Sequence, residues 1–424
     1  MLDLNFVVQN LPSVIAKLEK RQQNFAYLNK LPLLAQQRKS LLLEIQDLRS
    51  QKNQSAKKVA QKANAKEDIT LVLQDTNFLR DDLQKLEQKL KLKEQEIFDI
   101  LSITPNLPHD SLPIGTNDKD NKELYCEGQI RTFAFTPKDH VYLAEKLDIL
   151  DFKRASKISG SGFVVCKGLG ARLERALIQF MMDLHSKKGY QEIIPPYIIN
   201  EKTMFATGQL PKFEDEVYKL YNSKNNWYLN PTAEVPTINL HREEIFKPDT
   251  LPIKYVAYTT AFRQEAGSAG KDTRGIFRQH QFNKVELIQF CHPQNSYECL
   301  DQMLKDSEEV LNLLKLPYRV VLLSTGDLGF SMAKTYDLEV FLPSYNCYRE
   351  IGSISNSCDF QSRRANIKMK NPANNKNEYV HILNGSGLAV GRTVIAILEN
   401  YQNQDGTITV PEVLQPYLGT DIIK

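Results

Sequence analysis

Leucine and isoleucine recur at helical spacing in two runs within the first hundred or so residues, 31–48 and 79–101. Steps of three, four and seven residues form the heptad pattern that joins two helices along an apolar seam. The seam positions are Leu31, Leu34, Leu41, Ile45 and Leu48 in the first run and Leu79, Leu83, Leu86, Leu90, Ile97 and Leu101 in the second. The polar stretch 52–70 could hold a reversal, because it has few large apolar residues. The pattern predicts an antiparallel helical hairpin whose arms of about 35 residues extend about 50 Å.

The hydrophobic pattern changes after residues 102–115. This segment, SITPNLPHDSLPIG, contains three prolines, which restrict the backbone and mark a domain boundary. Beyond it, strand-like runs such as IKYVAYTTAF and FNKVELIQF alternate with helical stretches such as SYECLDQMLKDSEEVLNLLK. We therefore predict the α+β fold class, with an antiparallel helical coiled-coil hairpin in 1–104 and a sheet-based domain with flanking helices in 105–424.

The composition is that of an ordinary folded protein. Of 424 residues, 42% are hydrophobic and 25% are charged, which excludes a disordered or collagen-like chain. The sequence has no apolar run of about 18 residues, and its N-terminus lacks the pattern of a signal peptide. Six scattered cysteines suit a reducing compartment and argue against a structural zinc site. We therefore expect a cytoplasmic protein that does not cross a membrane.

The net charge of +3 conceals a local basic region. Residues 17–66 hold 12 basic and 3 acidic side chains, whereas 67–100 hold 5 basic and 9 acidic ones. The basic stripe therefore belongs to one helix of the hairpin. It suits a phosphate-rich partner, although a solvated helix face explains it equally well.

A second candidate for chemistry is the segment Phe262-Arg263-Gln264-Glu265, which follows the strand-like run IKYVAYTTA. Strand alternation predicts that Arg263 and Glu265 point the same way. A loop with Gly267, Gly270 and Lys271 leads into a second strand-like run. Arginines that grip phosphate would suit a nucleotide, but a hairpin with surface ion pairs fits the short motif as well. The sequence contains neither GxxxxGK[ST] nor GxGxxG, which disfavours P-loop NTPases and Rossmann dehydrogenases.

Longer stretches carry a family resemblance. FRQEAGSAGKDTRGIFRQHQFNKVE resembles motif 2 of class II aminoacyl-tRNA synthetases, in its seryl form. ALIQFMMDLHSKKGYQEIIPPYIIN resembles motif 1, with Pro196 as the motif's proline, and GSGLAVGRTVIAILENY resembles motif 3, with Arg392 as its arginine. The pieces TGQLPKF, LNPTAEVP and DFQSRR and the TPNLP linker are also similar to the family. The motifs run in the family's order over essentially the whole chain, which is identified as a member of the bacterial-type seryl-tRNA synthetases.

The resemblance implies a function for each part of the chain. Residues 1–104 would be a tRNA-binding arm, and 105–424 a class II catalytic domain built on an antiparallel sheet. The enzyme would be a ligase that activates L-serine with ATP to seryl-adenylate and pyrophosphate. It would then transfer serine to the 3′ end of tRNA(Ser), and of tRNA(Sec) where the host has it. Motif 1 implies a homodimer in which one tRNA touches the arm of one subunit and the active site of the other.

The family also assigns roles to single residues. Arg263 would bridge the serine carboxylate and the α-phosphate, and Arg392 would hold the distal phosphates. The implied catalytic residues are Arg263, Glu265, Glu350 and Arg392. The implied ATP-binding residues are Arg263, Gln264, Glu265, Arg278, Phe282, Glu350, Ile351, Gly352, Ser353 and Arg392. The implied serine-binding residues are Thr232, Ala233, Glu234, Arg263, Glu286 and Ser386, with Glu234 available to the ammonium.

Metal and tRNA ligands complete the expected set. Glu350 and Ser353 offer oxygen ligands to Mg²⁺ that arrives with ATP. Gly352 departs from the serine common in bacterial relatives, so it offers no side-chain ligand. The seven histidines show no HExxH or other short metal spacing, and we expect no zinc. The expected tRNA-binding residues are Lys52, Lys57, Lys58, Lys62 and Lys66.

Three other functions deserve comparison with this one. A threonyl or prolyl class II ligase is disfavoured by the TAE segment, by the hairpin, and by the lack of length for an editing domain. An amino-acid:carrier-protein ligase of related fold would lack the arm. A coiled-coil RNA-binding or scaffold protein with an inactive ligase domain is disfavoured because Arg263, Glu265, Glu350 and Arg392 are all present.

Overall fold

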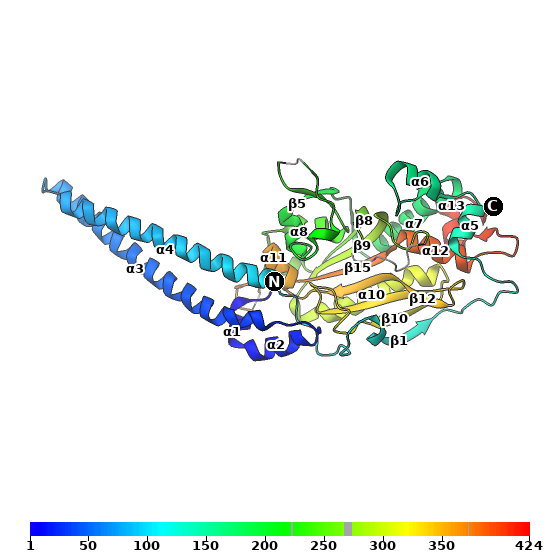
Figure 1. The fold of residues 1–424 in the computed structure, drawn as a ribbon, viewed down its shortest axis with the longest axis horizontal. Coiled ribbons are helices and arrows are strands. Elements are labelled where there is room, and N and C mark those ends of the chain that lie inside the picture. Colours follow the sequence, from blue (N-terminus) through cyan, green and yellow to red (C-terminus); the bar gives the residue numbers. More distant parts are fainter. Residues whose placement is uncertain (222–223, 267–273, 372) are drawn as a thin grey trace. The chain divides into compact units, whose positions relative to one another are not determined.

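The computed structural model describes residues 1–221, 224–266, 274–371 and 373–424, which form two compact units (Figure 1). One unit comprises 2–19 and 23–104, and the other comprises Met1, 20–22 and 105–424. The first unit is helical and the second combines helices with a large sheet. The predicted α+β class is therefore confirmed.

The helical unit is an antiparallel hairpin of α3 (Leu31–Asn64) and α4 (Thr70–Ser102), preceded by α1 (Leu4–Gln9), α2 (Leu11–Glu19) and a 3₁₀ turn (Ala26–Lys30). All the predicted seam positions are buried or half-buried, which confirms the heptad assignment. Two ion pairs cross the hairpin, Arg38–Glu94 at 2.9 Å and Arg49–Glu87 at 2.7 Å. Figure 1 shows the two long helices side by side along their length.

The reversal of the hairpin is shorter than the sequence predicted. Residues 52–64 continue α3, so only 65–69 lie between the two helices. The polar stretch is rich in Ala, Lys and Gln and has no Gly or Pro. These residues have high helix propensity, and the helix therefore continues although the apolar seam thins out.

The second unit is built on an eight-stranded sheet. Its order is β1 (Lys122–Glu127), β10 (Tyr318–Leu322), β11 (Lys334–Leu342), β12 (Cys347–Asn356), β15 (His381–Ala389), β9 (Gln281–Cys291), β8 (Ile253–Phe262) and β4 (Gln191–Ile193). Every neighbouring pair is antiparallel except β4 and β8, which are parallel. Helices α7 (Gly168–Lys187), α10 (Ser296–Leu313) and α12 (Val390–Asn400) pack against this sheet around the main hydrophobic core.

Shorter elements complete the unit. The remaining helices are α5 (His140–Lys146), α6 (Phe152–Ser159), α8 (Glu201–Thr207), α9 (Glu234–Ile238), α11 (Phe360–Ala365) and α13 (Gln415–Leu418). The remaining strands are β2 (Leu150–Asp151), β3 (Val165–Cys166), β5 (Ile198–Asn200), β6 (Trp227–Leu229), β7 (Ile245–Phe246), β13 (Lys368–Lys370), β14 (Asn377–Tyr379), β16 (Ile408–Thr409) and β17 (Ile422–Ile423). None of the helices in the described ranges has the length and apolar character that a membrane span requires. All six cysteines are free thiols.

The strand order brings parts of all three motif-like stretches into one sheet. The motif 1 stretch forms the later part of α7, then β4 and β5, of which β4 belongs to this sheet. The motif 2 stretch leads from the end of β8 into β9, and the motif 3 stretch forms most of β15 and α12. Because β9 lies between β8 and β15, motifs 2 and 3 are neighbours although about a hundred residues separate them. The sheet therefore assembles the residues that the motifs singled out.

Candidate active site

A cavity of about 180 Å³, open to solvent, lies over β9, β12 and β15 beside the start of α12. Its lining is mainly polar and charged. Nine of the ten residues expected to bind ATP line this cavity, together with Ser386 from the expected serine set. The nine are Arg263, Glu265, Arg278, Phe282, Glu350, Ile351, Gly352, Ser353 and Arg392.

Gln264 is the tenth expected residue, and its side chain lies elsewhere. Its Nε2 donates to the carbonyl of Val217 at 2.8 Å, and its backbone amide donates to the carbonyl of Glu216 at 2.9 Å. Gln264 therefore ties the end of the motif 2 strand to the segment around residue 216. In this structure its side chain does not line the cavity among the described residues.

The extended geometry predicted for Arg263 and Glu265 is wrong. β8 ends at Phe262, and Glu265 has a left-handed backbone with φ of 51°. Both side chains still line the cavity. They therefore face the same space, as predicted, but a turn of the backbone and not an extended strand brings them there. The loop residues Gly267, Gly270 and Lys271 lie outside the described residues.

Two ion pairs hold arginines on the cavity wall. Nη1 of Arg278 lies 3.1 Å from Oε2 of Glu265, and Nη1 of Arg392 lies 3.2 Å from Oε2 of Glu350. Arg392 also donates to the carbonyl of Glu350 at 2.8 Å. The charge of Arg392 is the main reason why the pKa of Glu350 lies below its ordinary value. The phosphates of a nucleotide could replace these carboxylates as partners of the arginines.

Arg263 lies between the motif 2 strand and the segment before Thr232. Its Nε donates to the carbonyl of Pro231 at 3.1 Å, and its guanidinium carbon lies 5.1 Å from the ring centre of Phe282. A guanidinium at this distance from an aromatic ring gains a cation–π interaction. Arg263 thus joins the motif 2 side of the cavity to the segment that carries the expected serine residues.

The expected serine residues are brought together by hydrogen bonds. Oγ1 of Thr232 donates to Oε2 of Glu286 at 3.0 Å, and Nε2 of Gln361 donates to Oε1 of Glu234 at 2.6 Å. The antiparallel register of β9 and β15 places Ser386 opposite Glu286. Ala233, which follows Thr232, is fully buried. These contacts form a buried polar cluster, the Glu234 cluster, whose groups suit the charges and the hydroxyl of a small zwitterion.

The pKa of Glu234 indicates which group this cluster could bind. Its side chain is buried, and burial raises its pKa to about 7, with the nearby carboxylate of Glu286 adding to the rise. Gln361 and Lys284 act in the opposite direction. A buried carboxylate that is costly to ionise on its own gains most from a cation beside it. The position therefore suits an ammonium group.

Gly352 can be explained by packing. A Cβ at this position would lie 3.0 Å from Cβ of Ser386 and 3.2 Å from Cδ2 of Leu388. Glycine therefore lets β12 approach these side chains of β15 more closely than another residue could without a shift. Gly352 contributes only its backbone to the cavity, as its lack of a side chain predicted.

Three residues of the site were not predicted. Lys284 forms a 2.7 Å ion pair with Glu286, and strand alternation from Phe282 to Glu286 could have revealed it. Gln361 lies within the DFQSRR stretch, but nothing in that stretch marks its contact with Glu234. Asp337 pairs with Ser353 across β11 and β12, and burial raises its pKa well above the usual range. This last contact depends on strand register and leaves no local signal.

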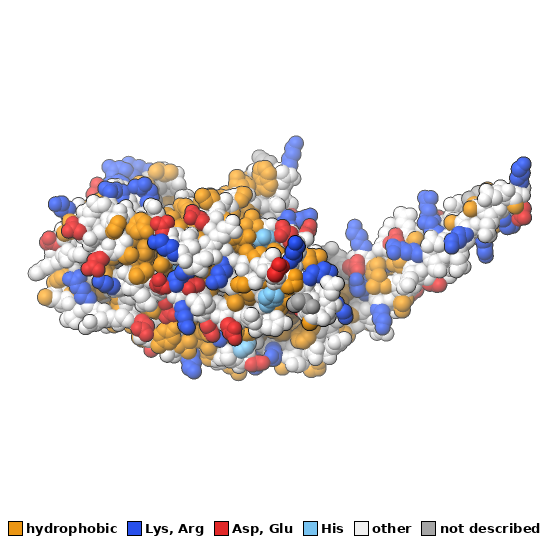
Figure 2. Space-filling view, turned by 180° about the vertical axis from the view of Figure 1, so that it is seen from behind, with side chains coloured by type: hydrophobic (Ala, Val, Ile, Leu, Met, Phe, Trp, Pro, Cys, Tyr) orange, Lys and Arg blue, Asp and Glu red, His pale blue; other side chains and the backbone are white. Residues whose placement is uncertain are grey.

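The expected tRNA-binding lysines lie in the helical unit. Lys52, Lys57, Lys58 and Lys62 belong to α3, and Lys66 follows it. All are exposed except Lys52, which is half-buried. Nζ of Lys62 lies 3.6 Å from Oε2 of Glu67. Figure 2 shows Lys and Arg side chains along the hairpin in blue.

Comparisons with known proteins agree over the full chain. Residues 1–108 match the family model described as seryl-tRNA synthetase N-terminal domain, and 217–401 match the tRNA synthetase class II core domain (G, H, P, S and T). The serine–tRNA ligase of Onion yellows phytoplasma (strain OY-M) is 99% identical over 424 residues and covers 100% of both chains. The serine–tRNA ligase of Phytoplasma mali (strain AT) is 57% identical over 426 residues, again with 100% of both chains covered.

A solved structure is similar over the same extent. The crystal structure of seryl-tRNA synthetase from Pyrococcus horikoshii complexed with ATP has a TM-score of 0.89 and 35% sequence identity. The match covers 100% of this chain and 99% of that one. Both the helical unit and the sheet-based unit therefore have counterparts in one protein.

Proposed function

The chain belongs to the seryl-tRNA synthetase family, as its motifs predicted, and on that premise we propose which of its groups carry out the reaction. The reaction is the ligation of serine to tRNA, driven by ATP. The full-length relatives at 99% and 57% identity are serine–tRNA ligases, so the threonyl, prolyl, carrier-protein and scaffold alternatives are set aside. The observation that carries the proposal is the cavity that collects residues of motif 2, β12 and motif 3. Two of its lining residues, Lys284 and Ser386, also adjoin Glu286 of the expected serine set.

Charge neutralisation and alignment supply the chemistry of the first step. The serine carboxylate must attack the α-phosphate of ATP, and both groups are anions. Arg263 bridges them, while Arg278 and Arg392 leave their carboxylate partners and hold phosphates. No general base is required, because the serine carboxylate is already ionised at neutral pH. Preorganised cations around two anions lower the barrier mainly through electrostatics and orientation.

Serine is recognised by its ammonium and its hydroxyl. Glu234 takes the ammonium, and the Thr232–Glu286 pair and Ser386 lie where the side chain must fit. A pocket built to hydrogen-bond a hydroxyl rejects alanine, because its buried partners are then left unpaired. The 3.0 Å contact between Thr232 and Glu286 supports this assignment, since it shows that the pocket's polar groups are already oriented.

Magnesium fits the site beside ATP. Oγ of Ser353 lies 3.4 Å from Oε1 of Glu350, so two oxygen ligands converge. Oδ1 of Asp337, opposite Ser353, is buried with no hydrogen-bond partner among the described residues. Mg²⁺ commonly uses one or two protein oxygens and completes its shell with phosphate and water. Bound there, the ion would neutralise phosphate charge, and Glu350 and Ser353 would hold it. In the described residues, His, Cys, Asp and Glu form no group of three that could hold a metal by themselves.

The arm and the dimer belong to the second step. The lysines of α3 bind the phosphate backbone of tRNA(Ser), and of tRNA(Sec) if the host has it. Exposed lysines at the distal end of a helical hairpin support this role, because backbone contacts position RNA without reading its bases. The division into units near Thr104 and Pro105 supports domain bounds of 1–104 and 105–424.

A homodimer through motif 1 completes the proposal. β4 lies at the edge of the large sheet, and Ile194, which follows it directly, is 77% exposed. Ile198 in β5, from the same motif 1 stretch, is 50% exposed. An open sheet edge followed by exposed apolar side chains supports association with a second copy. The six free thiols suit a reducing cytoplasm as the place of work.

Serine-dependent ATP–pyrophosphate exchange tests the assignments. The wild-type protein should exchange with serine and not with threonine or alanine. Arg263→Ala should abolish exchange while the protein stays folded by circular dichroism. Full activity of that variant would contradict the proposed site.

A further inference from the structure

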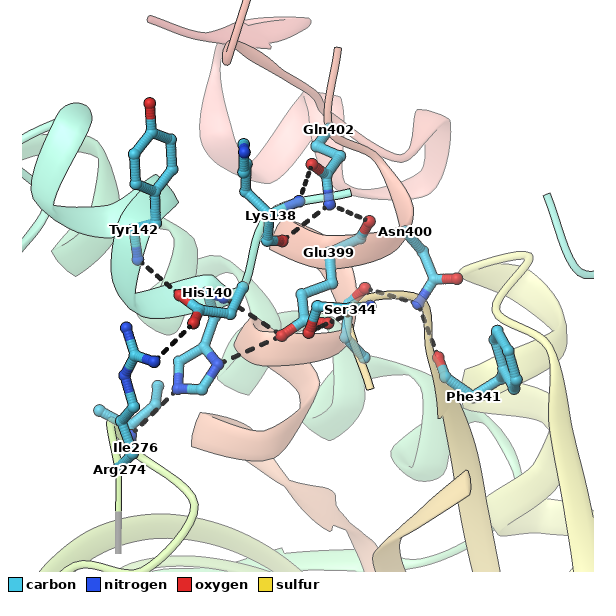
Figure 3. Close-up of polar contacts among 12 residues, drawn as sticks. Lys138, His140, Tyr142, Arg274, Ile276, Phe341, Ser344, Glu399, Asn400 and Gln402 are labelled. Atoms are coloured by element: carbon cyan, nitrogen blue, oxygen red, sulfur yellow. Dashed lines mark hydrogen bonds and ion pairs between the residues drawn. The ribbon is translucent and has the colours of Figure 1, made fainter. Parts of the chain in front are cut away.

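A buried polar network centred outside the cavity joins the motif 3 helix to the end of the motif 2 loop, where Ile276 and Phe277 line the cavity (Figure 3). Its centre is Glu399 in α12, which is fully buried together with His140 at the start of α5. Oε1 of Glu399 accepts from the backbone amide of His140 at 3.1 Å and from its Nδ1 at 3.3 Å. Oε2 accepts from the backbone amide of Ser344 at 3.2 Å and from its hydroxyl at 2.6 Å. A buried carboxylate with four donors is fully satisfied and holds its partners in place.

The partners of His140 fix its tautomer. The backbone amide of Ile276 donates to Nε2 of His140 at 3.4 Å. An amide N–H can only donate, so Nε2 carries no proton and Nδ1 carries the one that Glu399 accepts. Glu399 thereby makes Nε2 an acceptor aimed at the returning end of the motif 2 loop.

Four consecutive residues at that end contact Asp139 or His140. Nη1 of Arg274 lies 3.1 Å from Oδ2 of Asp139. Gly275 has φ of 77°, and a Cβ there would lie 1.9 Å from Nε2 of His140. Ile276 donates the hydrogen bond described above, and the ring of Phe277 meets the imidazole edge-on at 5.1 Å between centres. Asp139 and His140 therefore form the contact surface against which residues 274–277 pack.

The packing of residues 274–277 on His140 affects two arginines of the cavity. Arg278 directly follows these four residues in the chain. The carbonyl of Phe277 accepts from Nε of Arg392 at 3.4 Å, and Arg392 precedes Glu399 by about two turns of the same helix. The ring of Phe277 also meets Tyr345 edge-on at 5.8 Å, next to Ser344. Movement of His140 would therefore change the position of Arg278 relative to Arg392.

We propose that His140 is a positioning residue for ATP, which keeps Arg278 and Arg392 at the spacing that the phosphates require. The inference rests on the proposed ATP-binding role of these two arginines. The contacts described for the network include neither Glu234 nor Glu286, so serine binding should be unaffected. A substitution of His140 should therefore raise the KM for ATP and leave the KM for serine nearly unchanged.

Two substitutions separate this role from a general structural one. In His140→Gln the amide oxygen can reach the place of Nε2 and accept from Ile276. In His140→Asn the shorter amide can reach Glu399 but leaves the Ile276 amide unpaired. An unpaired buried donor is costly, so Asn should raise the KM for ATP at least tenfold in pyrophosphate exchange. Gln should raise it less than threefold, and the KM for serine should stay within twofold in both variants.

His241 supplies a matched control. It also pairs with a glutamate, since its Nδ1 lies 2.7 Å from Oε2 of Glu244, but it contacts none of residues 274–278 among the described contacts. His241→Asn should leave both KM values unchanged. Equal rises in both KM values for His140→Asn, no rise at all, or equal defects in the Asn and Gln variants would each overturn the inference.

Two further variants keep the test decisive. If His140→Asn does not fold, Gly275→Ala places a methyl group against the imidazole, and it should raise the KM for ATP alone. An unchanged KM for ATP in that variant overturns the inference. Arg278→Ala tests the proposed ATP site separately from the role of His140. An unchanged KM for ATP in this variant means that the proposed ATP site is wrong. A raised KM in Arg278→Ala beside a normal one in His140→Asn rejects only the role of His140.

Discussion

The ionisation of Glu234 should make serine binding depend on pH. Burial raises the pKa of Glu234 to about 7, so without a bound cation a large share of the carboxyl is protonated at neutral pH. Serine's ammonium favours the charged form, and its arrival must therefore expel the proton. Binding should weaken as the pH falls through 7, because an increasing part of the binding free energy goes into deprotonation.

The size of the effect follows from that pKa. With a pKa of 7, about a tenth of the carboxyl is ionised at pH 6 and about nine tenths at pH 8. The apparent Kd for serine should therefore rise about tenfold between pH 8 and pH 6, which corresponds to about 1.4 kcal/mol. Serine itself keeps both of its charges over this range, so the change of the apparent Kd with pH arises from the protein.

Isothermal titration calorimetry at pH 6, 7 and 8 measures both quantities. Repeating each titration in buffers of different ionisation enthalpy should show about 0.9 proton released per serine at pH 6 and about 0.1 at pH 8. Glu234→Gln, which keeps the shape without the charge, should weaken binding about 10- to 150-fold and remove the slope. A wild-type affinity that does not change with pH, or unchanged affinity in the Gln variant, would refute the reasoning.

Three other perturbations test separate parts of the account. Arg392→Ala should lower kcat/KM for ATP about 10²- to 10³-fold in pyrophosphate exchange, because it removes a preorganised cation; a loss below threefold would count against its phosphate role. Lys57→Glu with Lys58→Glu should raise the KM for tRNA and reduce the slope of log affinity against log salt by about 2, while exchange stays normal; an unchanged slope would exclude these lysines. Ile194→Glu should convert the proposed dimer to a monomer in sedimentation, whereas Ile114→Glu, at another exposed isoleucine outside motif 1, should not; a wild-type monomer would contradict the proposed interface.

The sequence predicted those features that depend on local periodicity. The seam from Leu31 to Leu101 required only heptad spacing, and the arm lengths followed from it. The polar stretch 52–70 does contain the reversal, at 65–69, but its first part continues α3, because helix propensity does not require apolar positions. The end of β8 was missed for a similar reason: alternation continues past Phe262, but the backbone turns to bring Glu265 to the cavity.

Contacts between distant segments were predicted only where the family resemblance supplied them. Glu286 and Ser386 meet because β9 and β15 are neighbours in a defined register, and strand order is not a property of either segment. The same holds for Gln361 against Glu234 and for Glu399 against His140. These pairs are 127 and 259 residues apart, and no periodic pattern relates them.

The central claim is that the cavity lined by the phosphate-binding arginines adjoins the serine-binding groups around Glu234. A crystal structure of the protein with a non-hydrolysable seryl-adenylate analogue tests it most directly. The account predicts the ammonium within about 3.2 Å of Glu234 and the phosphate mimic within the same distance of Arg263. An ammonium bound away from Glu234, or an adenylate outside the cavity lined by Arg263 and Arg392, would contradict it.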